Sequence, residues 1–296
     1  MTGHQLPQLH VGHGSHFGAL SVFPVWVDAP RIAGVDWAAN ALTVAEREGS
    51  PVVGELVLNN ASRRPLVILE GDLLQGGWQD RMLARSLVLA PREARVADAL
   101  CVEHGRWGGV SAHAARGRRS VPSVRHGNVS NDRISTDTDS QHEVWRRIGR
   151  YEIGLGATAS SSMLDHLDRS KPVELRRLDG QRGVILGVGG RVIGAELFGS
   201  VTGLAARWQG ILDAASLDAR IAPTVRTTSS NARRFARALQ AMTLEDGGDA
   251  GLARQLGSQQ GNLRASGIGF GGPASVGNQI IHLTAFDDSH PLLENA

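Results

Sequence analysis

The chain has 296 residues, of which 41% are hydrophobic, so it is long enough to bury a substantial core. Its 31 basic and 29 acidic residues leave a formal charge of only +2, which does not favour a nucleic-acid-binding role. Cys101 is the only cysteine, which excludes an internal disulfide and any zinc site built from several cysteines. The first 18 residues lack the apolar core of a secretory signal, and glycines and Arg191 interrupt the longest apolar stretch, 184–198. We therefore expect a cytoplasmic protein that does not cross a membrane.

The first part of the chain is predicted to form short antiparallel strands. Residues 1–18, rich in His and Gly, are expected to be a disordered tail before a strand at 20–27. A short helix at 36–41 would begin at Asp36. Turn signals then predict two strand pairs, 55–58 with 66–70 and 82–89 with 95–102. Such short connections favour an antiparallel sheet.

The second part is predicted to contain most of the helices. Residues 108–140 have few large apolar side chains and are expected to form a long mobile loop whose arginines are solvated. Gly189-Gly190 predicts a hairpin. Helices are expected at 141–155, 160–169, 204–213 and 230–244, and strands at 183–188, 191–198, 263–270 and 276–286.

These elements together indicate an α+β fold with a largely antiparallel sheet. We expect one domain over 19–287, between the tail at 1–18 and a C-terminal tail at 288–296. Whether the loop at 108–140 closes over a site is not decided by the sequence.

Carboxylates follow two strand-like runs, and this is the strongest indication of a site. Glu70 and Asp72 end the first run, and in a continuing strand both would point to the same face. Glu103 ends the second run in the same way. Together they could bind a divalent cation through oxygens, or provide an acid and a base. The alternative is a structural cluster in which they pair with arginines, namely Arg81, Arg85 and Arg106.

Other polar and aromatic residues near these carboxylates suit an anionic ligand. Arg81 and Arg106 could bind a phosphate, and Gln79 could add a neutral hydrogen bond. Trp107 could stack on a base or a ribose, although tryptophan also serves simply as core.

Cys101 and His104 are weaker candidates. Cys101 lies between two apolar residues, and a buried structural thiol is the alternative to a nucleophile. His104 could act as an acid, a base or a ligand, or could simply lie at the surface. We assign no metal ligand and no cofactor from the sequence.

Several of these motifs resemble those of a known family. The quoted runs are Leu69-Glu70-Gly71-Asp72, Gln79-Asp80-Arg81, Cys101-Val102-Glu103-His104-Gly105-Arg106-Trp107, Gly190-Arg191-Val192-Ile193-Gly194 and His282-Leu283. They resemble a bacterial and archaeal domain family named for its association with ADP-ribosylglycohydrolase and rhodanese-phosphatase genes. The resemblance covers residues 20–286 and implies one continuous domain.

The resemblance implies a link to NAD and ADP-ribose metabolism and a set of functional positions. There are departures from the family pattern: Asp80 stands where asparagine is expected, Trp78 where lysine is frequent, and Leu73 where an acidic residue is frequent. The positions carried over are Glu70, Gln79, Arg81, Cys101, Glu103, Arg106 and Trp107.

Two functional hypotheses follow from residues and resemblance together. In the first, the chain is a hydrolase for an ADP-ribose-type or related NAD-derived nucleotide. Arg81 and Arg106 would then hold the anion, and Glu103, with Glu70, would act as general base or accept a ribose hydroxyl. In the second, the same residues form a non-catalytic ligand sensor or a partner-binding module. The partner we expect is a small molecule rather than a nucleic acid or a membrane; the oligomeric state is left open.

Overall fold

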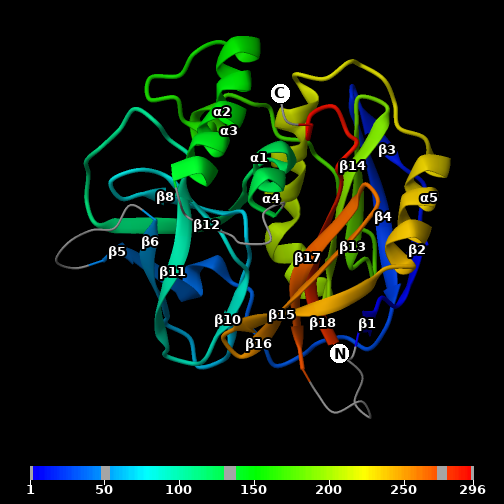
Figure 1. The fold of residues 1–296 in the computed structure, drawn as a ribbon, viewed down its shortest axis with the longest axis horizontal. Coiled ribbons are helices and arrows are strands. Elements are labelled where there is room, and N and C mark those ends of the chain that lie inside the picture. The colour runs from blue at the N-terminus through cyan, green and yellow to red at the C-terminus, as the bar shows by residue number, and fades with distance from the viewer. Residues whose placement is uncertain (1–2, 48–53, 130–137, 272–278, 295–296) are drawn as a thin grey trace. The chain divides into compact units, whose positions relative to one another are not determined.

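The computed structural model of the chain describes residues 3–47, 54–129, 138–271 and 279–294. The chain divides into two compact units, where the sequence predicted one domain (Figure 1). Unit 1 comprises Met1–Ala33, Val173–Trp208 and Asp218–Ala296, and unit 2 comprises Gly34–Pro172 and Gln209–Leu217. Because the chain leaves unit 1 and later returns to it, no terminal linker marks the division in the sequence.

Unit 1 is built on an antiparallel sheet in the order β1-β15-β16-β17-β18-β14-β13-β4-β2, with β3 also paired to β4. Its hairpin β13–β14 turns at Gly189 and Gly190, both of which have positive φ, as the sequence predicted. Its strands are β1 His4–Gln5, β2 Gln8–Val11, β3 Ser15–Phe17, β4 Leu20–Asp28, β13 Gly183–Val188, β14 Arg191–Phe198, β15 Thr243–Ala250, β16 Ala253–Gln260, β17 Leu263–Phe270 and β18 Gln279–Asp287.

Both predicted tails are corrected by the structure. Residues 4–17 contain three strands, and β1 pairs with β15, placing His4 opposite Leu244. At the other end, the buried side chain of Leu293 packs into unit 1, and His290 Nε2 lies 3.0 Å from the carbonyl oxygen of Val188. These pairings join segments that are far apart in sequence, so local composition could not indicate them.

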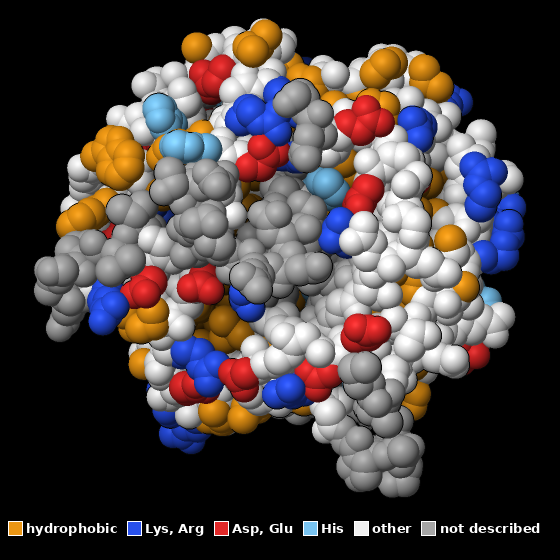
Figure 2. Space-filling view, viewed as in Figure 1, with side chains coloured by type: hydrophobic (Ala, Val, Ile, Leu, Met, Phe, Trp, Pro, Cys, Tyr) orange, Lys and Arg blue, Asp and Glu red, His pale blue; other side chains and the backbone are white. Residues whose placement is uncertain are grey.

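Helix α5, Ser229–Gln240, covers part of this sheet against β2, β14 and β17. Ala232, Phe235 and Leu239 are buried in its apolar stripe, whereas Arg233 and Arg234 are exposed. Figure 2 shows basic side chains gathered over α5, while elsewhere on that face acidic and basic side chains are intermixed. The helix predicted at 230–244 is therefore confirmed, although it ends at Gln240 and strand β15 begins at Thr243.

Unit 2 contains a closed barrel of six antiparallel strands in the order β11-β6-β5-β12-β8-β9. Alternate residues of β6 point inward, and Leu56 and Leu58 are fully buried there. The predicted strand at 82–89 is instead two strands, one in the barrel and one paired with β7. The strands are β5 Leu42–Glu46, β6 Glu55–Asn60, β7 Leu66–Ile68, β8 Asp72–Gly76, β9 Arg81–Leu83, β10 Leu87–Leu89, β11 Ala94–Cys101 and β12 Ala112–Arg119.

The predicted loop at 108–140 is largely a strand and a helix. Strand β12 closes the barrel by pairing with β5 and β8, and α1, Pro122–Val129, lies against α2, Thr138–Leu155. Residues 130–137 of the predicted loop lie outside the described residues. The small and polar residues of β12 suit a strand whose Arg119 is buried against carboxylates rather than against apolar side chains.

Three helices remain to be described. They are the 3-10 helix η1 Ala39–Ala41, α3 Met163–Asp168, which has Ser162 as its N-cap, and α4 Val201–Ala219. The α+β class is confirmed in the broad sense, although strands predominate and helices do not concentrate in the second half. Across the described ranges, no helix combines the length and the apolar character needed to cross a membrane.

The barrel core yields a stability prediction. Leu56→Ala should reduce the free energy of unfolding by about 2–5 kcal/mol, because it removes buried methyl groups and leaves a cavity. Val57→Ala is the matched control, since Val57 is on the opposite face and only half-buried. Urea unfolding with an unchanged m-value would measure both. Equal losses for the two variants would contradict the inward packing of Leu56.

Candidate functional site

Two turns of unit 2 bring the polar residues of the site together. One turn connects β8 to β9 and carries Asp80; the other follows β11 and carries Glu103 and Arg106. The chain after β11 lies along the segment that contains Ser160, whose carbonyl accepts the His104 amide at 3.1 Å. The serines of that segment therefore lie beside the carboxylates.

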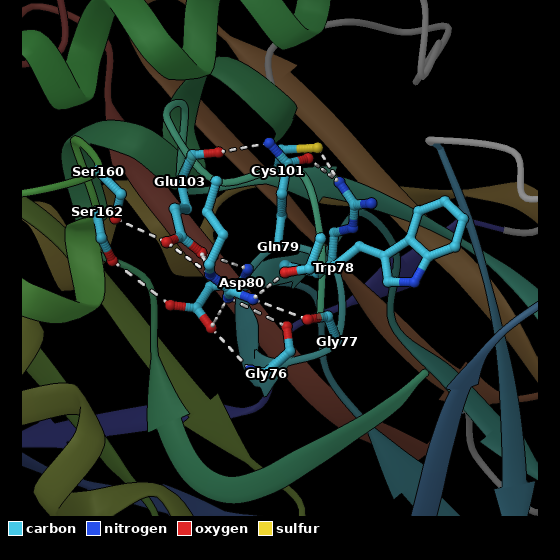
Figure 3. A network of polar contacts seen from close by, with 12 residues as sticks. Gly76, Gly77, Trp78, Gln79, Asp80, Cys101, Glu103, Ser160 and Ser162 are labelled. Atoms are coloured by element: carbon cyan, nitrogen blue, oxygen red, sulfur yellow. Dashed lines mark hydrogen bonds and ion pairs between the residues drawn. The ribbon is translucent and has the colours of Figure 1, made fainter. Parts of the chain in front are cut away.

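We call Asp80, Glu103, Arg106, Ser160 and Ser162 the carboxylate cluster. Figure 3 shows Ser160 and Ser162 pointing toward Glu103 and Asp80, respectively. The Ser160 hydroxyl donates to Glu103 Oε1 at 2.7 Å, and the Ser162 hydroxyl donates to Asp80 Oδ2 at 3.4 Å. Arg106 Nη2 contacts both carboxylates, at 2.6 Å from Glu103 and 3.4 Å from Asp80. One cation thus holds two acids from different turns.

Glu103 is held in its ionised form. Burial would raise the pKa of Glu103, but the hydrogen bonds from Arg106, Ser160 and the Asp80 amide outweigh burial and lower it. The Asp80 amide donates to Oε2 at 3.0 Å, and Arg106 Nε lies 2.9 Å from Oε1. A carboxylate with this many donors is a weak proton acceptor and a stable negative charge.

Asp80 differs from Glu103. Burial raises the pKa of Asp80, and the negative charge of Glu103 adds to that effect. The hydrogen bond from the Gly76 amide to Oδ1, at 2.7 Å, opposes the shift without reversing it. The two neighbouring acids therefore have pKa values displaced in opposite directions, the pattern of a proton donor beside a permanent anion. Sequence analysis noted Asp80 only as a departure from the family pattern and did not select it.

Backbone strain lies between the two serines. Ser161 has a φ of 49°, a left-handed conformation that a non-glycine residue adopts at a cost of roughly 1–3 kcal/mol. It separates the two hydroxyls, so that one reaches Glu103 and the other Asp80. The contacts of these serines span 57 and 82 residues of chain, so local sequence does not indicate them.

Arg106 is the partly exposed member of the cluster, with 33% of its side chain accessible. Besides its two carboxylates it donates from Nη1 to the carbonyl oxygen of Gly77 at 2.8 Å. Its guanidinium is thus mostly engaged within the protein. The predicted role in holding an anion would require a ligand to exchange with one of these weaker contacts, such as Asp80 at 3.4 Å.

Gln79 and Arg81 lie beneath the cluster and are buried. Gln79 Nε2 donates to the backbone carbonyl of Glu103 at 3.0 Å, and Arg81 Nη1 donates to Gln79 Oε1 at 3.0 Å. Gln79 therefore positions the backbone of Glu103, and Arg81 holds the Gln79 side chain in place. Direct contact with a ligand, the role expected from the sequence, is not supported by an arginine that is 2% exposed.

A second buried pair, Glu46 and His113, extends this layer into the barrel. Arg81 Nη2 is 3.9 Å from Glu46 Oε1, and His113 Nε2 is 3.1 Å from the same oxygen. Burial lowers the pKa of His113 despite the neighbouring carboxylate. Sequence analysis did not select either residue, since each lies in an otherwise ordinary strand.

Cys101 is fully buried, and its sulfur contacts the Arg81 guanidinium. Burial raises the pKa of its thiol to about 11, although Arg81 opposes the shift. The Gln141 side chain pairs with both the amide and the carbonyl of Cys101, each at 2.8 Å. These are the properties of a structural thiol, which disfavours the nucleophilic role considered from the sequence.

Glu70 and Asp72 form a separate group and do not join Glu103 in the way the sequence suggested. Glu70 Oε1 is 2.5 Å from Arg125 Nη2, and Asp72 Oδ1 is 3.0 Å from Arg119 Nη1. All four side chains are buried. Their arginines come from the segment predicted to be a solvated loop, not from the expected set of Arg81, Arg85 and Arg106. This group is a buried ion-pair network rather than an accessible site.

The tryptophans of the motif region are exposed. Trp107 is 64% exposed and Trp78 is 39% exposed, so both present apolar surface to solvent. The ring of His104 instead packs edge-on against Trp145, with centroids 4.5 Å apart. Stacking of Trp107 on a ligand stays a prediction. In the part of the chain that is described, no group of three or more His, Cys, Asp or Glu side chains is placed to hold a metal ion.

Comparison with known families identifies the class of protein to which this fold and site belong. Residues 8–286 match the family described as ARG and Rhodanese-Phosphatase-superfamily-associated Protein domain. The chain belongs to this family, which is the one that the sequence motifs resemble. Searches of curated proteins and of solved structures each found no match.

The opposite pKa shifts of the two acids predict opposite pH effects on stability. Glu103, with its lowered pKa, stabilises the fold above its unfolded pKa, and this contribution is lost as pH falls through the folded value. Asp80, with its raised pKa, contributes stability at low pH that is lost as pH rises through its folded value. Melting temperatures from about pH 2.5 to 7 should therefore show Glu103→Gln increasingly destabilised relative to wild type as pH rises toward the ordinary glutamate pKa, with no further change above it. Asp80→Asn should instead gain relative to wild type; parallel curves for the two variants would contradict the assignment.

The buried network predicts a large effect at Arg119. Arg119→Met should cost about 3–5 kcal/mol, because it leaves Asp72 with an uncompensated buried charge. The adjacent Arg118→Met is the control, since its partner Asp168 is 57% exposed. We expect the control to cost less than about 1 kcal/mol in denaturant unfolding. Comparable losses in both variants would show that burial does not distinguish the pairs.

Proposed function

We propose that this chain is a hydrolase for an ADP-ribose-type nucleotide, with the carboxylate cluster as its active site. The observation that carries the proposal is the pair of neighbouring acids whose pKa values are displaced in opposite directions. Pairs of this kind divide the work of acid–base chemistry: the acid with the raised pKa transfers the proton, and the ionised acid stabilises positive charge.

In this proposal Asp80 protonates the leaving group as a glycosidic bond to ribose breaks. Glu103 accepts a hydrogen bond from a ribose hydroxyl or stabilises the positive charge that develops on the sugar. Water then adds to the anomeric carbon and gives a proton to Asp80, which restores the protonated acid. This changes the role expected from the sequence, in which Glu103 was the general base, because its many donors make it a weak one. Glu70 has no part in the step, since it is engaged with buried arginines.

Two further observations support a ligand at this place. Arg106 and Ser160 are partly accessible, so the cluster can be reached from solvent. Trp107 and Trp78 expose aromatic surface on the same two turns. The ADP-ribose class is supported by the family's described association with ADP-ribosylglycohydrolase genes.

Turnover by acid-replacement variants tests the proposal. Purified protein is incubated with ADP-ribose, NAD and an ADP-ribosylated peptide, and products are separated by chromatography. Asp80→Asn should reduce the rate by about 10²–10⁴-fold while ligand still raises the melting temperature, because only proton transfer is lost. The rate of wild type should fall as pH rises through the raised pKa of Asp80.

Asp98→Asn is the matched control, because Asp98 lies on β11 with 44% of its side chain exposed and forms a long ion pair with Arg85 at 3.9 Å. Its rate should equal that of wild type. A melting-temperature increase without turnover would replace the enzyme by the sensor hypothesis. No binding of any of these nucleotides would refute both.

A further inference from the structure

Unit 1 contains a cavity of about 200 Å³ that is unrelated to the carboxylate cluster of unit 2. Its walls are mainly apolar, and four of the apolar side chains are buried. The apolar walls are provided by Leu6, Val27, Ile32, Leu197, Phe198 and Ile280. Openings of this kind, apolar with few polar groups, are typical of small-molecule sites.

One charged side chain, Arg182, lines the cavity, and it is only 3% exposed. Among the residues that the structure describes, its guanidinium donates to backbone carbonyls and to no carboxylate. Nη2 donates to Ala29 at 2.7 Å and also to Val27, and Nη1 donates to Pro30 and Gly199, each at 3.1 Å. These four bonds fix the side chain in place.

The charge of Arg182 is therefore not neutralised by a salt bridge within the described ranges. Burial lowers the pKa of Arg182 and the nearby Arg31 acts in the same direction, while Asp28 opposes them. Buried charges in proteins are ordinarily paired with an opposite charge. A negatively charged ligand bound in the cavity beside Arg182 would supply that opposite charge. The contrast with Arg119 and Arg125 of unit 2, both paired with carboxylates, is direct.

We propose that this cavity binds a short-chain carboxylate, with the anionic end toward Arg182 and the alkyl chain against the apolar walls. An apolar cavity of about 150 Å³ suffices for a six-carbon ring. The cavity here therefore suits a carboxylate of about six carbons. Because the four Nη hydrogens of Arg182 are donated to backbone carbonyls, Arg182 attracts the carboxylate by its charge. Gln5 and Gln279 also line the cavity and can donate hydrogen bonds to the carboxylate.

Calorimetric titration of the full chain with butyrate, pentanoate and hexanoate tests this proposal. Affinity should rise about fourfold with each added methylene, the increment expected for burying a CH₂ group. Pentanol and pentylamine, which have the same alkyl chain as hexanoate without the anion, should bind at least tenfold more weakly than hexanoate. Absence of hexanoate binding, or equal binding of pentanol, would overturn the proposal.

A filled cavity supplies the structural control. Ala29→Phe places a ring at the cavity from a residue that is exposed, and whose carbonyl bond to Arg182 does not depend on the side chain. It should abolish hexanoate binding with little change in melting temperature. Ala33→Phe, exposed and outside the cavity lining, should bind like wild type. Hexanoate binding that survives Ala29→Phe would place the ligand elsewhere and contradict the assignment.

Discussion

Two carboxylates from different turns, Asp80 and Glu103, share one guanidinium nitrogen, Nη2 of Arg106, and the geometry of the unit 2 site follows from that shared contact. Without it, two acids this close would repel each other. The sharing is unequal, because Glu103 receives the shorter contact and a second donor from the same guanidinium, Nε. Asp80 is left with the longer contact and with the repulsion of Glu103. Burial of Asp80 and the unequal contacts of Arg106 thus separate the two pKa values. Ser160 lowers the pKa of Glu103 further, whereas Ser162 opposes the shift of Asp80 without reversing it.

Buried arginines in this protein are satisfied in two different ways. In unit 2, Arg119 and Arg125 pair with carboxylates, which cancels their charge and fixes the segments that carry them. In unit 1, the Arg182 contacts within the described residues are to carbonyl oxygens, which satisfies its Nη hydrogen-bond donors but leaves its net charge. Satisfying donors and cancelling charge are separate requirements. A buried arginine such as Arg182, whose hydrogen bonds are made but whose charge is not cancelled, is suited to binding an anion.

Local signals predicted much of the fold, and long-range pairings account for what they missed. The Gly189-Gly190 hairpin and β17 follow from residues within a few positions of each other, and both were predicted with their boundaries. The pairing of β1 with β15 joins residues at the two ends of unit 1, and nothing in residues 1–18 alone indicates it. Within the site, Glu103 could be predicted from the sequence because it is a carboxylate at the end of an apolar, strand-like run. Asp80 and Ser160 could not be chosen in the same way, because their importance comes from Glu103 itself.

Glu70 and Glu103 show why the same sequence signal leads to different outcomes. Each follows an apolar run, each is 3% exposed, and each is bonded to arginine. They differ in the exposure of the arginine: the Arg125 side chain is 3% exposed and that of Arg106 is 33% exposed. An ion pair in which both side chains are buried can only stabilise the fold. An ion pair whose arginine is accessible to solvent can exchange one of its contacts for a contact with a ligand. A charged residue at a strand end therefore predicts a buried ion pair, and the accessibility of its partner, which depends on segments distant in sequence, decides whether that pair can also be a site.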